Sequence, residues 1–358
     1  MNRISAISKA RFGLAVIIAS AALAACGGGG GSDPTTNSNT NSQNPSNPSN
    51  PTNPSTPAAT AATLQQPSAT PQTVTASGHA TADGIAFVNT VRQNVGLPQL
   101  LDDATLKQVS QNHTVYLVDN MATGHYETAG LPGYTGQSPF TRGSTVSGEV
   151  VVAGDPLAFP NSLSPVQALF DAPYHRLLML GDWASMGVAN TTSATWQAFN
   201  IDFGGTPSST NSSKLVAYPY PGQTDVPTQW FASENPNPFA SHPQFENSYV
   251  GYPITLQGAM GMKLSSISFV VTDSGGNSIQ CQQQTSDNDT ELSNGAMCIP
   301  FAPLKAGATY NVHVTGVVTG YGTALPVDVS WQFKTSQAAV MRNMMGVVPQ
   351  QERKLPQF

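Results

Sequence analysis

The chain has 358 residues, of which only 9% are charged, and its 14 basic and 20 acidic side chains give a formal net charge of −6. A protein that binds nucleic acid is expected to carry a basic stripe, so this balance argues against a nucleic-acid partner. Positions 78 to 335 comprise 258 residues of globular composition, a length at which one hydrophobic core becomes difficult and two are comfortable.

Residues 1–25 have the features of an export signal. Three basic residues occur within the first 11 positions, and the apolar stretch 12–23 is shorter than the ~20 residues that a membrane helix needs. The stretch ends in small residues before Cys26, which resembles a bacterial lipobox. The resemblance implies a lipid on Cys26 and anchoring in the bacterial cell envelope, at the outer membrane if the host is Gram-negative. The alternative is an ordinary signal peptide and a secreted protein.

Residues 26–77 are rich in Gly, Asn, Pro, Ser and Thr, with almost no charges or large apolar side chains. Such a segment cannot bury enough apolar surface to offset the entropy of ordering it. We therefore expect a disordered, flexible tether between the anchor and the folded part.

Residues 78–217 carry helical and strand patterns in mixture. Apolar residues recur at helical spacing before Gly96 and again before Gly124, and glycine is a common residue just past a helix end. Apolar, aromatic-rich runs that are bounded by turn residues predict two strands further on. The expected helices and strands span 82–95, 103–121, 164–170, 183–190 and 195–204. The pattern predicts an α/β or α+β domain.

The next segment, 218–250, is rich in proline and lacks periodicity, so we expect a joint between two domains. From 251 to 336 the apolar period changes to two, with a Ser-Gly-Gly-Asn turn at 274–277. The alternating residues are Ile267, Phe269, Val271, Ile279, Cys281, Tyr310, Val312, Val314, Val329, Trp331 and Phe333. This pattern predicts an all-β sandwich domain, and the stretch "AGATYNVHVTG…VSWQFKT" resembles bacterial immunoglobulin-like modules. Residues 337–358 form a tail without a clear pattern.

Two cysteines remain once Cys26 is set aside. In an oxidising compartment Cys281 and Cys298 are most simply a disulfide. Closing the loop of 298 − 281 = 17 residues would stabilise the fold by roughly 3 kcal/mol.

Among the six histidines, His125 and His175 are the candidates for a functional site. His113 lies on the apolar side of its predicted helix, and we expect a buried residue with one hydrogen bond. His125 and Glu149 each follow a glycine in predicted loops, and His175 lies in "APYHR". Sites are often built on loops that a rigid scaffold positions, so these three residues could converge. The alternative is that they hydrogen-bond one another and hold loops together.

The order of several short motifs adds to this interpretation. The helix "FVNTVRQNVGLPQL" is followed by "GHYE", by a "GE" loop, and by "PYHR" before "GDWASMGVA". Over residues 82–205 this order resembles bacterial members of the CAP superfamily, the SCP-like extracellular proteins. The resemblance implies an α-β-α sandwich with a cleft that holds two histidines and two acidic residues.

Carried over by position, the resemblance assigns His125, Glu149 and His175 to that cleft. The family's Asn after the glutamate is replaced by Val150 here. The fourth member is either Asp171, four residues before His175 and able to share a helix face with it, or Glu127.

Two imidazoles and a carboxylate are suitable ligands for zinc or another divalent metal, so His125, Glu149 and His175 form a candidate metal set. The chain has no GxSxG motif, no free reactive cysteine and no phosphate-binding loop. The family resemblance implies a protein that binds a lipid or sterol, a cell-wall component or a protein partner through the cleft. A hydrolase with metal-activated water and Glu149 as the base is one alternative, and a structural or interaction protein with a vestigial cleft is another.

Overall fold

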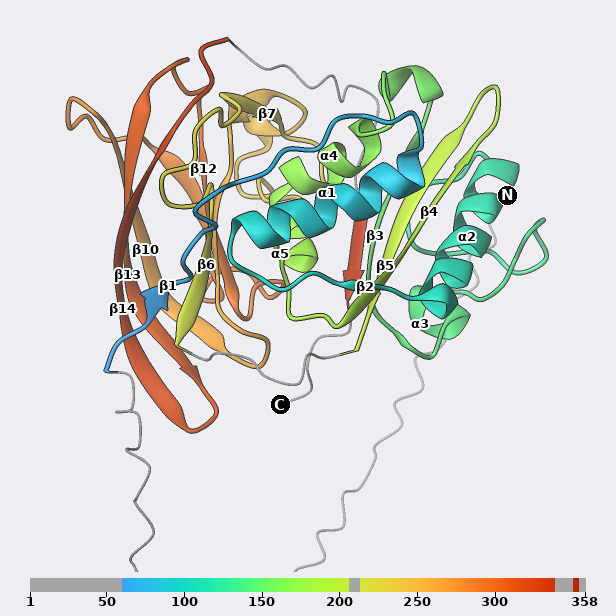
Figure 1. Cartoon of the computed structure of the whole chain (residues 1–358), viewed down its shortest axis with the longest axis horizontal. Helices are drawn as coiled ribbons and strands as arrows, with labels where there is room; N and C mark the ends of the chain where they lie inside the picture. The colour runs from blue at the N-terminus through green and yellow to red at the C-terminus, as the bar shows by residue number, and fades with distance from the viewer. Residues whose placement is uncertain (1–59, 206–212, 339–349, 354–358) are drawn as a thin grey trace, which may run out of the picture. The chain divides into compact units, whose positions relative to one another are not determined.

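The computed structural model describes residues 60–205, 213–338 and 350–353 (Figure 1). Their fold is a mixed α+β structure with three larger sheets and one two-stranded ribbon. The predicted signal peptide, Cys26 and most of the predicted tether lie outside the described residues.

The three predicted helices are present with small shifts in their ends, as α1 (Ala80–Asn94), α2 (Ala104–Asp119) and α4 (Ser164–Asp171). Two short helices, α3 (Pro139–Arg142) and α5 (Pro173–Met179), were not predicted. The Asp103 side chain caps α2 by accepting hydrogen bonds from two backbone N–H groups. Pro173 separates α4 from α5, because Ala172 before it is extended at ψ 120° and proline disfavours a helical conformation in the preceding residue.

The first sheet has the strand order β15-β3-β5-β4-β2. Its strands are β2 (Leu101–Asp102), β3 (Val146–Gly154), β4 (Ser185–Thr192), β5 (Gln197–Gly204) and β15 (Gln350–Arg353). Strands β3, β4 and β5 pair antiparallel, and β15 adds an edge strand from the segment predicted as an unstructured tail. Glu149 therefore lies within a strand, and the prediction that "GE" belongs to a loop was wrong.

Helices cover both faces of this sheet. Val151 and Ala153 of β3 pack with Tyr116 and Leu117 of α2. Gly148, Val150 and Val152 face the opposite way, and a side chain at Gly148 would meet Leu178 of α5. Because successive strand residues point to opposite faces, the odd-numbered residues from Glu149 on face α2 and the even-numbered residues from Gly148 on face α5.

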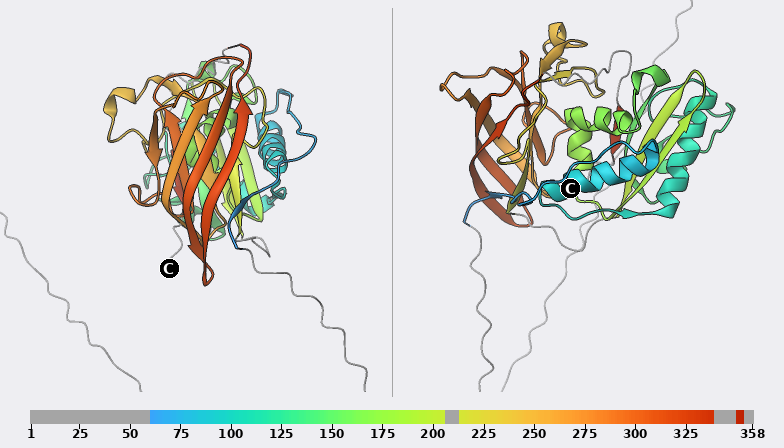
Figure 2. Two further views of the ribbon diagram at one scale, coloured as in Figure 1. Left: turned by 90° about the vertical axis from the view of Figure 1, so that its left-hand side faces the viewer. Right: turned by 45° about the horizontal axis from the view of Figure 1, so that its top comes forward.

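Two further sheets form the all-β part. One has the order β1-β6-β9-β12-β11 and the other β10-β13-β14, with the latter three strands side by side in the left view of Figure 2. Their bounds are β1 (Thr63–Leu64), β6 (Lys214–Tyr218), β9 (Ile254–Gln257), β10 (Lys263–Asp273), β11 (Cys281–Gln284), β12 (Gly295–Pro300), β13 (Thr309–Gly320) and β14 (Thr323–Lys334). The alternation is confirmed, since Tyr310, Val312 and Val314 are buried and their neighbours are exposed.

The predicted turn at 274–277 is present, with Asp273 Oδ1 accepting from the N–H groups of Gly275 and Asn277. The chain after the turn pairs with β10 over a short stretch, where Ser278 lies opposite Thr272 and the N–H of Ile279 donates to the carbonyl of Val271. It then joins the other sheet, where β11 pairs with β12. The predicted disulfide between Cys281 and Cys298 is confirmed and joins these two neighbouring strands.

Two predicted linkers contain ordered structure. Residues 60–77, expected to be tether, include β1, which pairs in parallel with β6, and Ala62 is 3% exposed. The predicted joint 218–250 contributes β7 (Gln229–Phe231), which pairs with β8 (Tyr249–Gly251).

Helix α5 packs between two sheets. On one side Leu178 lies against Gly148 of β3, and on the other Leu177 lies against Gly295 of β12. The buried apolar residues on both sides of α5 form one continuous cluster. The segments predicted as two domains therefore share a hydrophobic core around α5.

Candidate functional site

His125 and Glu149 meet in a buried ionic network. His125 Nδ1 lies 2.6 Å from Glu149 Oε1, and Arg142 donates to Glu149 Oε2 over 2.5 Å. Arg142 also donates to the backbone carbonyl of His125 over 2.6 Å. Glu149 is completely buried, and the side chains of His125 and Arg142 are 3% and 1% exposed. Two of the three residues that the sequence placed in the site are thus in direct contact, and Arg142, the last residue of α3, binds to both of them.

The carboxylate of Glu149 is ionised in this setting. Burial alone would raise its pKa, but the positive charges of His113 and Arg142 and the hydrogen bond from His125 hold that pKa well below its usual range. Asp202 lies opposite Glu149 on the adjacent strand β5, and burial together with the charge of Glu149 raises the pKa of Asp202 well above its usual range. Two neighbouring carboxyl groups thus titrate far apart, which favours one proton shared by the pair.

A second pair, His113 and Glu127, extends the network toward α2. His113 Nδ1 lies 2.9 Å from Glu127 Oε1, and its Nε2 lies 3.0 Å from the carbonyl oxygen of Gly124. A carbonyl oxygen only accepts, so Nε2 carries a proton. Glu127 also accepts from the N–H of Thr135 over 2.6 Å. Burial would raise the pKa of Glu127, but His113, Thr135 and Arg142 lower it. His113 is buried as expected, but it makes two polar contacts rather than one.

His175 has a different partner from the one the sequence suggested. Its Nδ1 lies 2.7 Å from Glu234 Oε1, and the same oxygen accepts from the backbone N–H groups of Tyr174 and His175 at the start of α5. Burial raises the pKa of Glu234, whereas the contacts with His175 oppose that rise. Asp171, the first candidate for the fourth position, instead accepts a hydrogen bond from Tyr252.

The predicted set is divided between two places in the fold. Glu149 projects from the α2 face of β3, whereas His175 lies on α5, which packs against the other face. Over the described residues, no group of three or more His, Cys, Asp and Glu side chains is arranged to hold a metal ion. The expected convergence of His125, Glu149 and His175 on one ion is therefore not found there, because the sheet separates Glu149 from α5.

The sequence interpretation missed three charged residues: Arg142 and Asp202 in the network around Glu149, and Glu234 beside His175. Arg142 stands seven residues before Glu149, and an arginine in a chain with so few charges was a usable signal. Asp202 alternates with Ile201 and Phe203 in a strand that is buried along its whole length, and a buried acid in such a strand needs a partner. Glu234 lies in the predicted joint, where no periodicity drew attention to it.

No protein-family model matches this sequence, and no curated protein matches it. The similarity to the CAP superfamily therefore stays a prediction that rests on the motifs. Among the described residues, no helix has both the length and the apolar character needed to span a bilayer.

Proposed function

We propose that this chain is a binding protein of the bacterial cell envelope, lipid-anchored through Cys26, with a CAP-like first domain. Its binding surface is the loop 120–138 between α2 and α3, and its partner is a cell-wall polysaccharide. The observation that carries the proposal is the position of Tyr126. This tyrosine is 58% exposed, although His125 and Glu127 on either side of it are 3% exposed.

The buried network fixes the backbone of this loop. Glu127 receives hydrogen bonds from Thr135, and Arg142 binds the carbonyl of His125. Asn120 Nδ2 donates to the carbonyl of Pro132 over 2.9 Å. A loop that is ordered before binding loses little conformational entropy when a ligand arrives.

Several exposed side chains of the loop are apolar or aromatic. Met121 is 63% exposed, Leu131 43% and Tyr134 40%, in addition to Tyr126. Clustered exposed apolar side chains indicate interaction surfaces, and tyrosine offers a flat apolar ring with a hydroxyl at its end. A sugar ring has an apolar face and a rim of hydroxyls, so it matches this surface. The net charge of −6 disfavours an anionic membrane surface as the partner.

A double substitution on the loop tests this function. Tyr126→Ser with Tyr134→Ser should abolish co-sedimentation of the full chain with purified insoluble cell-wall sacculi. Its thermal unfolding temperature should stay unchanged, because both side chains are exposed. Leu157→Ser is a matched control, since Leu157 is 87% exposed and lies outside the loop. Equal sedimentation of the double variant and the wild type would overturn the proposal.

A metal-assisted hydrolase is a second candidate, favoured by the contact between His125 Nδ1 and Glu149. A carboxylate on one ring nitrogen orients an imidazole for metal binding or proton transfer through the other nitrogen. Calorimetric titration with zinc, on the wild type and on His125→Ala with His175→Ala, distinguishes the candidates. Saturable binding that the double variant loses would support the hydrolase, whereas the binding function predicts no saturable heat.

A further inference from the structure

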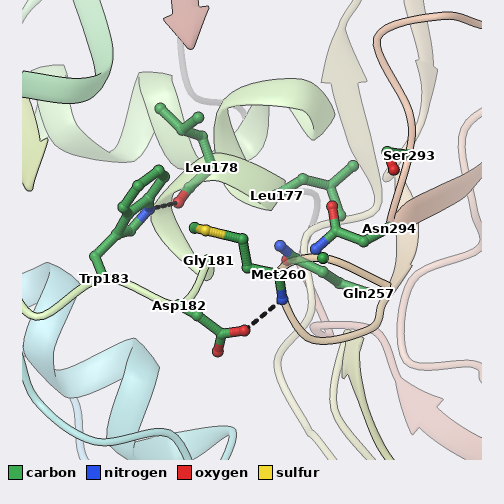
Figure 3. A pocket seen from close by; sticks show the side chains of 10 residues that line it. Leu177, Leu178, Gly181, Asp182, Trp183, Gln257, Met260, Ser293 and Asn294 are labelled. Atoms are coloured by element: carbon green, nitrogen blue, oxygen red, sulfur yellow. Dashed lines mark hydrogen bonds between the residues drawn. The ribbon is translucent and has the colours of Figure 1, made fainter. Parts of the chain in front are cut away.

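A second feature of the molecule lies apart from the loop 120–138, in the space between α5 and the sheet that contains β9 and β12. A partly enclosed cavity of about 40 Å³ opens there. Its wall includes Leu177, Leu178, Trp183, Gln257, Met260 and Asn294. Leu178 and Trp183 lie at one end and Gln257 and Asn294 at the other, with the side chain of Met260 between them (Figure 3). Apolar and polar side chains thus both line the cavity.

Gln257 has an unsatisfied polar atom at this cavity. The residue is 6% exposed, and its side-chain oxygen Oε1 is buried without a hydrogen-bond partner among the described residues. Buried polar side-chain atoms are nearly always hydrogen-bonded. The backbone of Gln257 is held in the middle strand β9, paired with Val216 of β6 and Gly295 of β12. The free acceptor is therefore presented from a rigid position.

The other polar groups of the wall already have partners. Asp182 Oδ2 accepts from the N–H of Met260 over 2.5 Å, and Asn294 Nδ2 donates to the carbonyl of Gly258 over 2.8 Å. Trp183 Nε1 donates to the carbonyl of Leu178 over 2.7 Å. These bonds fix the walls before any ligand binds, and they leave the acceptor of Gln257 for a ligand.

Size and polarity together define the ligand group. A single water needs about 10–15 Å³ of such space, so the cavity admits a group of roughly three or four non-hydrogen atoms. The group must donate one hydrogen bond to Gln257 Oε1 and place an apolar part against Trp183 and Leu178. An acetamido group meets both requirements, since its N–H donates and its methyl is apolar.

We propose that this cavity binds the acetamido group of an N-acetylated molecule, with Gln257 as the residue that recognises its N–H. N-acetylated amino sugars and N-acetylated peptides both carry this group. The site is separate from the loop 120–138, and its occupation does not depend on the binding function proposed for that loop.

Saturation-transfer NMR on the full chain tests the proposal with three probes: N-acetylglucosamine, glucosamine and N-acetylalanine. We expect transfer to the acetyl methyl of an N-acetylated probe and none to glucosamine. Transfer to N-acetylglucosamine alone identifies a sugar as the source, and transfer to N-acetylalanine alone identifies a peptide. No transfer to either methyl overturns the proposal.

Two variants locate the signal. Gln257→Met keeps the length of the side chain but removes the acceptor, and it should weaken binding at least tenfold. Met260→Phe fills the cavity and should abolish binding without touching Gln257. Gln284→Leu is the matched control, because Gln284 is 8% exposed and its amide already donates to the carbonyl of Pro238. Unchanged binding in both cavity variants would overturn the assignment. The Tyr126→Ser and Tyr134→Ser variant should keep the methyl signal, so the two proposals can fail independently.

Discussion

Replacing Arg142 by leucine tests whether the buried ionic network stabilises the fold. The substitution removes two short hydrogen bonds, to Glu149 and to the carbonyl of His125. Hydrogen bonds to charged groups contribute about 1.5–3 kcal/mol each, and breaking a buried ion pair costs about 3–5 kcal/mol because a charge is left without compensation. The two estimates overlap at a loss of about 3–5 kcal/mol in the free energy of unfolding.

Urea unfolding at pH 7 measures this loss as a shift of the midpoint at constant slope. The second variant, Arg142→Leu with Glu149→Gln, removes both charges and should recover much of the loss. Lys107→Leu removes a positive charge from the exposed face of α2 and should change stability by less than ~0.5 kcal/mol. A loss below ~1 kcal/mol for Arg142→Leu alone would match an exposed ion pair and would refute the reasoning.

The same variant changes the response to pH. The pKa of Glu149 is lower in the folded protein than its usual value, so the unfolded chain binds more protons as the pH falls. The stabilisation is fully present above the ordinary glutamate pKa of about 4.3 and is lost as the pH falls through the folded-state value. Without Arg142 the folded pKa of Glu149 rises, and the dependence of stability on pH below about 5 should flatten.

Two further outcomes follow from the structure. Asp202→Asn should raise the free energy of unfolding at pH 7, since a carboxyl whose folded pKa is raised makes stability fall as the pH rises. Urea unfolding at pH 5 and pH 7 checks this, and a difference from wild type that did not grow with pH would contradict it. Cys281→Ala with Cys298→Ala should lower the free energy of unfolding by roughly 3 kcal/mol. Reductant added to the wild type should lower the urea midpoint to that of the double variant. A midpoint that neither the substitutions nor the reductant changed would contradict a stabilising disulfide.

The helices and strands with a clear apolar pattern of their own could be predicted from the sequence. Helix α2 has a regular apolar face and an Asp103 cap, and β13 alternates between a buried and an exposed face. Strand β3 was misread because it is buried on both sides, with helices over each face. Such a strand has no alternation, and its glycines at 148 and 154 suggested a loop. The pairing of residues 60–77 with β6 depends on contacts 150 residues away, which local composition cannot indicate.

The candidate site could be predicted from the sequence only in part. His125 and Glu149 were correctly placed beside each other, because both lie on the α2 side of β3. His175 was grouped with them on the strength of motif order, yet order along a chain does not say on which face of a sheet a residue lies. Shifting one residue along a strand changes the face, so a glutamate at position 148 would have pointed toward α5. The odd position of Glu149 within β3 instead pairs it with Arg142 and Asp202 and leaves His175 to Glu234.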